Sequence, residues 1–229
     1  MQLSHRLATI AECVPKDSKV VDVGTDHAYI PIYLIKNNLI KTCIATDINS
    51  GPLQKAKLNM QLHRVENIEL KLTNGLQGVK CKEADTIIIA GMGGYLMIDI
   101  LKNSLELVQS AKRLILQPQQ DIAQVRKFLH YIGFKIEDEV FIQDDEKYYT
   151  VIIAVLGNEK YNHAYDYVYG KILIDKKTAL FQHWMQQKQQ KLKEIEIYLQ
   201  QGHSQHTKKR KEELENELKM HSEVMACIF

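Results

Sequence analysis

The chain has 229 residues, of which 45% are hydrophobic and 25% charged, with a formal net charge of +2. This balance is typical of a folded globular protein and excludes a disordered chain, while a charge so near zero indicates no partner by itself. No stretch approaches the ~20 consecutive apolar residues of a membrane-spanning helix, and the N-terminus shows no signal-peptide cleavage site, so we expect a cytoplasmic protein with no membrane partner. The four cysteines form no C-x-x-C pair, and we expect no metal.

Helix-like and strand-like segments alternate through the first half of the chain. Leu3, Leu7 and Ile10 keep helical spacing until Pro15 ends the segment. Predicted strands then cover residues 19–24, 42–47, 67–72, 85–91 and 113–118, with helices beginning near 28, 49 and 94 and a last helix ending near 133. Strands that are apolar on both faces and separated by helices predict a parallel sheet covered on each side.

The alternation ends in a predicted antiparallel hairpin. Residues 134–142 and 148–156 are both strand-like, and only "QDDEK" separates them. Five parallel strands followed by such a hairpin resemble the Rossmann-like fold of class I methyltransferases. That fold is α/β, with a seven-stranded, mostly parallel sheet in which the last strand is inserted antiparallel to its neighbours.

The strand pattern disappears from about residue 163 onward. One apolar stripe runs from Phe181 to Leu199 and another from Leu214 to Ile228, with a helix-stopping Gly202 between them. This pattern predicts a C-terminal α-helical coiled-coil hairpin, although the polar Gln187 and Lys188 weaken its seam. We therefore expect two domains, a catalytic domain over 1–157 and a helical coiled-coil domain over 158–229.

Polar or glycine-rich sequence follows four neighbouring strands. These ends are "DVGTDH" (22–27), Asp47, Asn74-Gly75 and "AGMGG" (90–94). In an open α/β sheet, ligands bind outside the carboxyl ends of the strands, so these ends predict one pocket. The first loop lacks the G-x-G-x-x-G dinucleotide fingerprint, and its carboxylates favour a cationic cofactor such as S-adenosylmethionine. Taken singly, Asp47 could cap the next helix, Asn74-Gly75 could be an ordinary turn, and Asp22, Asp26 or His27 could be structural.

Five motifs in order resemble the bacterial tRNA adenine-N1 methyltransferases that act on A22 in the D-arm. They are "DVGTDHAYIPIYL", "ATDINSGPLQKAKLN", "TNGL", "IIAGMGG" and "LILQPQ", and the match runs from about residue 3 to 156. The resemblance implies S-adenosylmethionine-dependent methylation of adenine N1 in tRNA. It implies cofactor binding by Asp22, Gly24, Asp47, Ile48, Asn74, Gly75, Gly91 and Gly93, with Met92 at the floor where methyl group and base meet. Gln119 departs from the Asn that the family often has after "LQP".

The catalytic residues that we predict are Asp26, Met92 and His27. A carboxylate such as Asp26 could accept a hydrogen bond from the exocyclic amine while positive charge develops on the adenine. We predict that Lys208, Lys209, Arg210 and Lys211 of the C-terminal domain contact tRNA phosphates, and that the protein is a monomer. Two alternatives remain: an inactive methyltransferase-like adaptor that binds RNA or a partner protein, and a nicotinamide-dependent oxidoreductase. The missing glycine fingerprint disfavours the oxidoreductase.

Overall fold

The computed structural model describes the backbone of residues 1–200 and 205–229, with the side chains of all of these except 200 and 205–208. The chain divides into two compact units, Met1–Lys160 and Tyr161–Phe229. Among the described residues, no helix has the length and apolar character that crossing a membrane requires.

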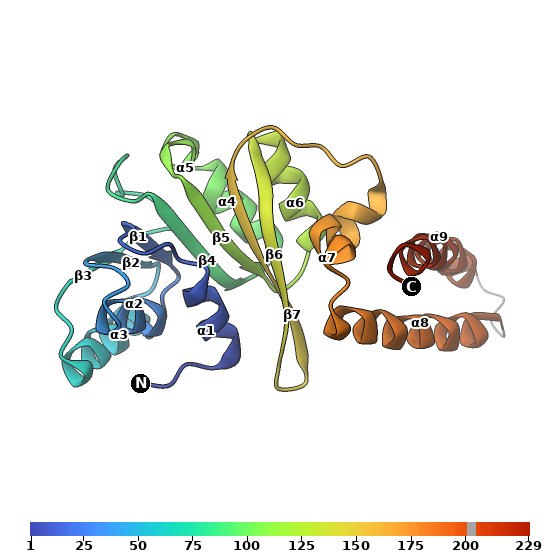
Figure 1. The fold of residues 1–229 in the computed structure, drawn as a ribbon, viewed down its shortest axis with the longest axis horizontal. Coiled ribbons are helices and arrows are strands. Elements are labelled where there is room, and N and C mark those ends of the chain that lie inside the picture. Colours follow the sequence, from blue (N-terminus) through green and yellow to red (C-terminus); the bar gives the residue numbers. More distant parts are fainter. Residues whose placement is uncertain (201–204) are drawn as a thin grey trace. The chain divides into compact units, whose positions relative to one another are not determined.

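The first unit is an α/β fold built on one seven-stranded sheet (Figure 1). Its strands are β1 (Val20–Val23), β2 (Cys43–Asp47), β3 (Ile68–Leu72), β4 (Thr86–Met92), β5 (Arg113–Pro118), β6 (Phe134–Asp144) and β7 (Lys147–Leu156). Their spatial order is β3-β2-β1-β4-β5-β7-β6, with β1 to β5 parallel and β7 antiparallel to both of its neighbours. The predicted class I methyltransferase sheet is confirmed.

Two groups of helices cover the sheet. The helices are α1 (His5–Glu12), α2 (Tyr29–Lys36), α3 (Ser50–His63), α4 (Gly94–Lys102), α5 (Leu105–Ser110) and α6 (Ile122–Tyr131). Helix α2 contacts α1 and α3, whereas α4 contacts α5 and α6, and the two groups lie on opposite faces of the sheet (Figure 1). Both faces of the central strands are therefore buried, which explains why β1 is buried at every residue and β5 at every residue after Arg113.

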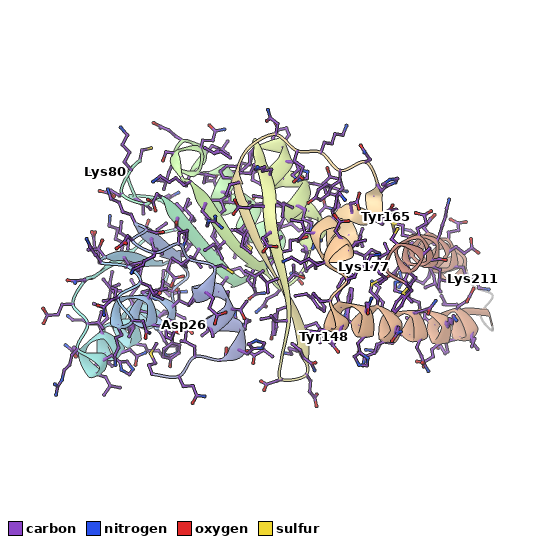
Figure 2. The ribbon with its side chains drawn as sticks, viewed as in Figure 1. Asp26, Lys80, Tyr148, Tyr165, Lys177 and Lys211 are labelled. Atoms are coloured by element: carbon purple, nitrogen blue, oxygen red, sulfur yellow. The ribbon has the colours of Figure 1, made fainter. Side chains whose placement is uncertain are left out.

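The β6–β7 hairpin takes part in a buried ion pair and carries a half-buried aromatic pair. The Arg126 guanidinium on α6 donates to the Glu139 carboxylate at 2.8 Å, and both side chains are almost completely buried. Near the turn, the ring of Tyr148, which is labelled in Figure 2, stacks on the ring of Phe141 with centroids 5.6 Å apart. A bulge between Ile136 and Asp138 interrupts the regular pairing of this hairpin.

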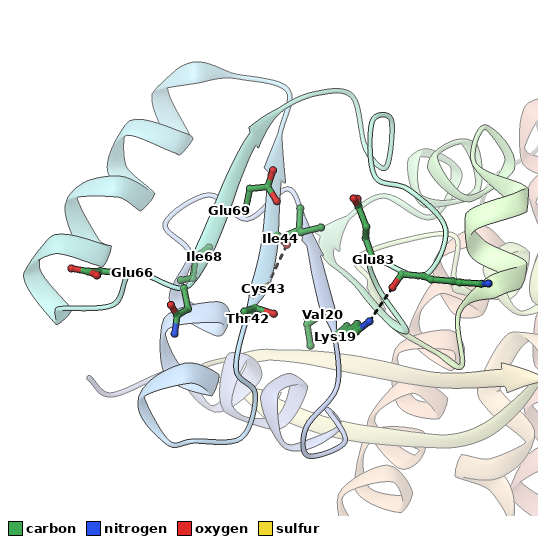
Figure 3. Close-up of a pocket in the computed structure, with 11 residues that line it drawn as sticks. Lys19, Val20, Thr42, Cys43, Ile44, Glu66, Ile68, Glu69 and Glu83 are labelled. Carbon is green, nitrogen blue, oxygen red and sulfur yellow. Dashed lines mark hydrogen bonds between the residues drawn. The ribbon is translucent and has the colours of Figure 1, made fainter.

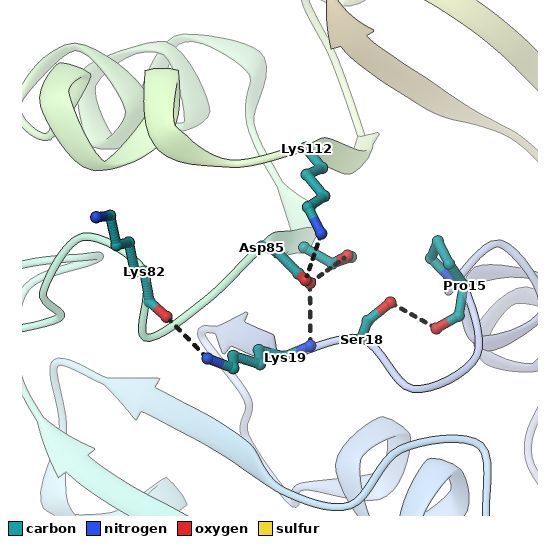
Figure 4. Close-up of polar contacts among 7 residues, drawn as sticks. Pro15, Ser18, Lys19, Lys82, Asp85 and Lys112 are labelled. Carbon is teal, nitrogen blue, oxygen red and sulfur yellow. Dashed lines mark hydrogen bonds and ion pairs between the residues drawn. The ribbon is translucent and has the colours of Figure 1, made fainter.

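At the N-terminal ends of β1, β2 and β3 lies a cavity of about 560 Å³ (Figure 3). Its charged lining mixes two lysines, Lys19 and Lys82, with three glutamates. Beside it, Asp85 accepts hydrogen bonds from the Lys19 backbone N–H at 3.0 Å and from the Lys112 ammonium at 3.5 Å (Figure 4). Asp85 thereby ties the starts of β1, β4 and β5 together, which fixes where their opposite ends emerge.

The second unit consists of helices. A π-helical turn, η1 (Asp166–Gly170), leads into α7 (Lys171–Lys176), α8 (Ala179–Gln200) and α9 (Gln205–Ile228). Helices α8 and α9 contact each other, but a supercoiled hairpin stays a prediction. Lys188, in the middle of α8, pairs with Glu217 of α9 at 3.0 Å and lies over the Tyr169 ring at 5.0 Å. Its charge therefore has partners within this unit.

Candidate functional site

A cavity of about 320 Å³ opens at the C-terminal ends of β1 and β4, which is where ligands bind in open α/β sheets. The residues that line it are Arg6, Leu7, Asp22, Gly24, Thr25, Asp26, His27, Tyr29, Ile30, Ala90, Gly91 and Gln119. Five of the predicted site residues, Asp22, Gly24, Asp26, His27 and Gly91, are thus brought together. The larger cavity of Figure 3 lies at the other end of the strands, where β1, β2 and β3 begin, and none of these five residues lines it.

Asp22 is a buried acid inside a β-strand. It is the third residue of β1, its side chain is 5% exposed, and its carboxylate accepts a hydrogen bond from the Thr25 hydroxyl at 2.5 Å. Burial raises the pKa of Asp22 from 3.8 to about 6, although the Thr25 hydrogen bond lowers it in part. Ionising a buried carboxylate costs free energy because the charge loses its hydration. A cationic ligand in the cavity would offset that cost by electrostatic attraction, so Asp22 favours binding of a cation.

Gly24 lets the chain turn away from the sheet with a left-handed backbone. Its φ is +69°, and a Cβ at this position would collide with the methyl group of Met92. The backbone N–H groups of Gly24 and Thr25 both donate to the Thr46 carbonyl, at 2.8 and 3.0 Å. The loop after β1 is therefore fastened to the end of β2. Met92 does not line the cavity but packs over Gly24.

The glycines of "AGMGG" have different surroundings. Gly91, with φ +77°, lies at a β-bulge between Ala90 and Met92 and lines the cavity, so it brings bare backbone to the ligand. Gly93 and Gly94 begin α4, and a Cβ on either would press against the Gln120–Asp121 segment. These last two glycines permit close packing of α4 against the loop after β5, and Gly93 does not line the cavity.

Asp26 and His27 stand at the exposed side of the cavity, in the turn between β1 and α2. The Asp26 side chain is 63% exposed, and its carboxylate lies 3.4 Å from Nε2 of His27 (Figure 2). The imidazole also stacks on Tyr29, with ring centroids 5.0 Å apart. Asp26 has φ +48°, a conformation that Asp and Asn tolerate better than most residues.

Four predicted cofactor residues lie at the ends of β2 and β3, outside the cavity lining. The carboxylate of Asp47, the last residue of β2, accepts the backbone N–H of Asn49 at 2.8 Å, and Ile48 is 63% exposed. The Gly75 carbonyl accepts the Thr46 hydroxyl at 2.8 Å, which holds the exposed Asn74 and the buried Gly75 beside the end of β2. These residues share one edge of the sheet with the cavity.

Arg6 and Gln117 were missed by the sequence analysis. Arg6 lies on α1, lines the cavity, and donates from Nη1 to the side-chain oxygen of Gln117 at 2.8 Å. Gln117 is fully buried in β5. Gln117 follows the apolar residues 114–116 within β5. Because buried polar groups need a partner, this glutamine was the signal in the sequence that could have indicated a functional side chain on β5.

The chemistry of the cavity fits S-adenosylmethionine, whose sulfonium and ammonium groups are positive. A buried carboxylate, Asp22, faces it, and two glycines with left-handed backbone, Gly24 and Gly91, line it. A metal has less support: in the part of the chain that the structure describes, no three His, Cys, Asp or Glu side chains gather as a metal site requires.

The basic residues predicted to bind RNA belong to α9. Lys209 and Arg210 are exposed, and Arg210 pairs with Glu213 at 3.0 Å. Lys211 lines a small cleft between α8 and α9 (Figure 2). The side chain of Lys208 lies outside the described residues.

Comparison with known proteins identifies the family. A family model described as "Methyltransferase domain" matches residues 3–152. The tRNA (adenine(22)-N(1))-methyltransferase of Bacillus subtilis (strain 168) is 32% identical over 234 residues, covering 98% of each chain. A Streptococcus pneumoniae protein solved in complex with S-adenosyl-L-methionine superposes with a TM-score of 0.87 at 30% identity, over 98% of this chain and all of the other. M. capricolum TrmK, in complex with S-adenosyl-homocysteine, gives a TM-score of 0.86 at 28% identity over the whole of both chains. This chain therefore belongs to the methyltransferase domain family and, within it, to the family of tRNA (adenine(22)-N(1))-methyltransferases.

Proposed function

We propose that this protein transfers the methyl group of S-adenosylmethionine to N1 of adenine 22 in the D-arm of tRNA. The observation that carries the proposal is the end-to-end match with the Bacillus subtilis enzyme, which includes the C-terminal unit. The cavity at the ends of β1 and β4 supports it, because its buried acid and bare backbone suit the cofactor. We place the reaction in the cytoplasm and expect the protein to act as a monomer.

In this proposal, the ends of different strands bind different parts of the cofactor. Asp22 and Gly24 hold the methionine end, Asp47 and Ile48 hold the ribose, and Asn74 with Gly75 flanks the adenine ring. Hydrogen bonds from the Gly24 and Thr25 N–H groups and from the Thr46 hydroxyl tie these three segments to one another. A substitution that loosens one segment should therefore weaken the whole cofactor site.

The target base lies at the ends of β4 and β5, with the segment Gly91–Gly93 as its floor, of which Gly91 lines the cavity and Met92 and Gly93 lie behind it. Bound S-adenosylmethionine supplies an electrophilic methyl group, and adenine N1 offers an in-plane lone pair, so the protein's main tasks are alignment and exclusion of water. Asp26 accepts a hydrogen bond from the exocyclic amine and stabilises the positive charge that develops on the ring. His27, held between Asp26 and Tyr29, keeps that carboxylate in position.

The C-terminal unit supplies tRNA contacts through Lys208, Lys209, Arg210 and Lys211. Phosphate contacts of this kind position an RNA without reading its sequence. The adenine itself must leave its stack to enter the cavity, which costs a few kcal/mol. The binding energy of the remote contacts offsets that cost.

The test is methylation of an unmodified tRNA transcript with labelled S-adenosylmethionine, followed by reverse transcription. N1-methyladenine blocks base pairing, so we expect a stop at position 22 that depends on the cofactor. A matched transcript with G in place of A22 should accept no label at that position. Cofactor binding by calorimetry without any methylation of the A22 transcript would overturn the proposal and support the inactive adaptor instead.

A further inference from the structure

Arg6 carries a positive charge that forms no close ion pair within the described part of the first unit. Its guanidinium has five N–H donors, and the hydrogen bond from Nη1 to Gln117 uses one of them. Within the described part of the chain, no carboxylate lies within ion-pair distance of it. The Asp144 carboxylate instead accepts the backbone N–H of Arg6 at 3.1 Å, and this bond lowers the pKa of Asp144.

The position of this guanidinium is nevertheless defined from two sides. Gln117 is fully buried, and its amide nitrogen donates to the Pro118 carbonyl at 3.2 Å, so its oxygen is oriented towards Arg6. The Tyr149 ring lies below the guanidinium, with Cζ 5.6 Å from the ring centroid. A half-buried cation held by a neutral amide and an aromatic face, beside a cavity, is arranged to receive an anion.

The surroundings of Arg6 indicate which anion this is. Its partners come from β5 (Gln117) and β7 (Tyr149), and Nη1 lies 3.6 Å from where a Cβ of Gly91, on β4, would be. Most predicted cofactor residues instead lie at the ends of β1, β2 and β3, and the two at the end of β4, Gly91 and Gly93, stand where the methyl group and the base are expected to meet. Arg6 therefore stands on the half of the sheet edge that the target nucleotide occupies in the proposed function.

We propose that Arg6 is a substrate-positioning residue that binds a backbone phosphate next to the target adenosine, and that Gln117 holds its guanidinium in place. This inference rests on the proposed function, because it takes tRNA as the substrate. A bidentate contact between the guanidinium and a phosphate fixes orientation as well as adding affinity. It acts at the cavity itself, in contrast to the predicted contacts of the C-terminal unit.

The experiment compares the wild type with Arg6→Ala, Arg6→Gln and Arg6→Lys, and with Lys41→Ala as a control. Gln at position 6 keeps a donor for Gln117 without the charge, so it tests the proposal even if the Ala variant folds poorly. Lys41 is an exposed cation just before β2, at the opposite edge of the sheet. We measure cofactor affinity by calorimetry without RNA, and tRNA affinity and kcat/KM over an about sixfold range of salt, from roughly 50 to 300 mM.

Both neutral variants should lose about tenfold or more in kcat/KM for tRNA, with cofactor affinity within about twofold of wild type. The slope of log affinity against log salt should fall by about 0.7–0.9, the value for one phosphate contact. Arg6→Lys should keep the wild-type slope because it keeps the charge, and Lys41→Ala should match the wild type throughout. An unchanged salt slope in both neutral variants refutes the inference. Loss of cofactor affinity in them also refutes it, since the guanidinium would then bind the cofactor's carboxylate. If the wild type itself methylates no tRNA, the proposed function fails instead.

Discussion

Replacing Asp22 with Asn should stabilise the protein while abolishing cofactor binding. Asp22 is buried, and its pKa is raised from 3.8 to about 6, so the folded state holds its proton more tightly than the unfolded state does. Above pH 6 the carboxyl is ionised in both states, and the folded state carries the cost of a buried charge. A difference of roughly two pKa units corresponds to about 3 kcal/mol at pH 7. Asn removes that cost and can still accept the Thr25 hydrogen bond.

The pH dependence has a definite sign. Because the folded pKa is raised, the destabilisation is absent below pH 3.8, grows as pH rises, and is complete above about pH 7. The variant should therefore exceed the wild type in unfolding free energy by about 1.5 kcal/mol at pH 5 and about 3 kcal/mol at pH 7. In thermal unfolding at pH 7, this difference corresponds to a rise in Tm of roughly 6–12 °C.

The measurement is urea unfolding of both proteins at pH 5, 6, 7 and 8 without cofactor, with calorimetric titration of S-adenosylmethionine at the same pH values. Wild-type cofactor affinity should increase as pH rises through about 6, because the ionised carboxylate is the form that attracts a cation. An Asp22→Asn variant that is less stable than the wild type at pH 7, or a stability difference that does not change with pH, would refute the reasoning.

Three further changes test the site, the core and the second unit. Asp26→Asn, which suits the left-handed backbone at φ +48°, should lower kcat by about tenfold or more without weakening cofactor binding, and wild-type turnover would remove Asp26 from the mechanism. Arg126→Met should cost about 3–5 kcal/mol in urea unfolding, because it leaves the buried Glu139 carboxylate without its guanidinium, and a cost under about 1 kcal/mol would contradict this. Deleting residues 161–229 should abolish tRNA methylation and retain cofactor binding, and unchanged tRNA affinity of the truncated chain would show that this unit is not the RNA-binding part.

The sheet could be predicted from the sequence because its strands are buried on both faces and separated by clear helical segments. Residues 113–118, for example, were predicted as a strand and form β5 with the same limits. Helix α5 (Leu105–Ser110) was missed, since six residues are too few to show a helical period. The same holds for η1 and α7, which lie just after the domain boundary that the sequence indicated.

The candidate site was predictable where its residues follow strands and unpredictable where they come from elsewhere. Asp22, Gly24 and Gly91 stand at the ends of β1 and β4, and the rule that such ends converge on one edge brings them together. Arg6 lies on an amphipathic helix, 111 residues before the Gln117 that holds it. No local pattern reports a contact over that separation, because the hydrophobic period shows which face of α1 is buried but not what its polar face meets.

The bond between the Arg6 backbone and Asp144 also constrains how the protein is made. The two residues are 138 positions apart, so α1 leaves the ribosome long before the hairpin that receives it. At translation rates of about 5–20 residues per second, the delay is roughly 7–30 s. During that time the apolar side of α1 has no hairpin to pack on, and the mouth of the cavity is incomplete. The part of the cavity that contains Asp22 and Gly24 can thus form early in synthesis. Arg6 reaches its final position only after β6 and β7 have joined the sheet.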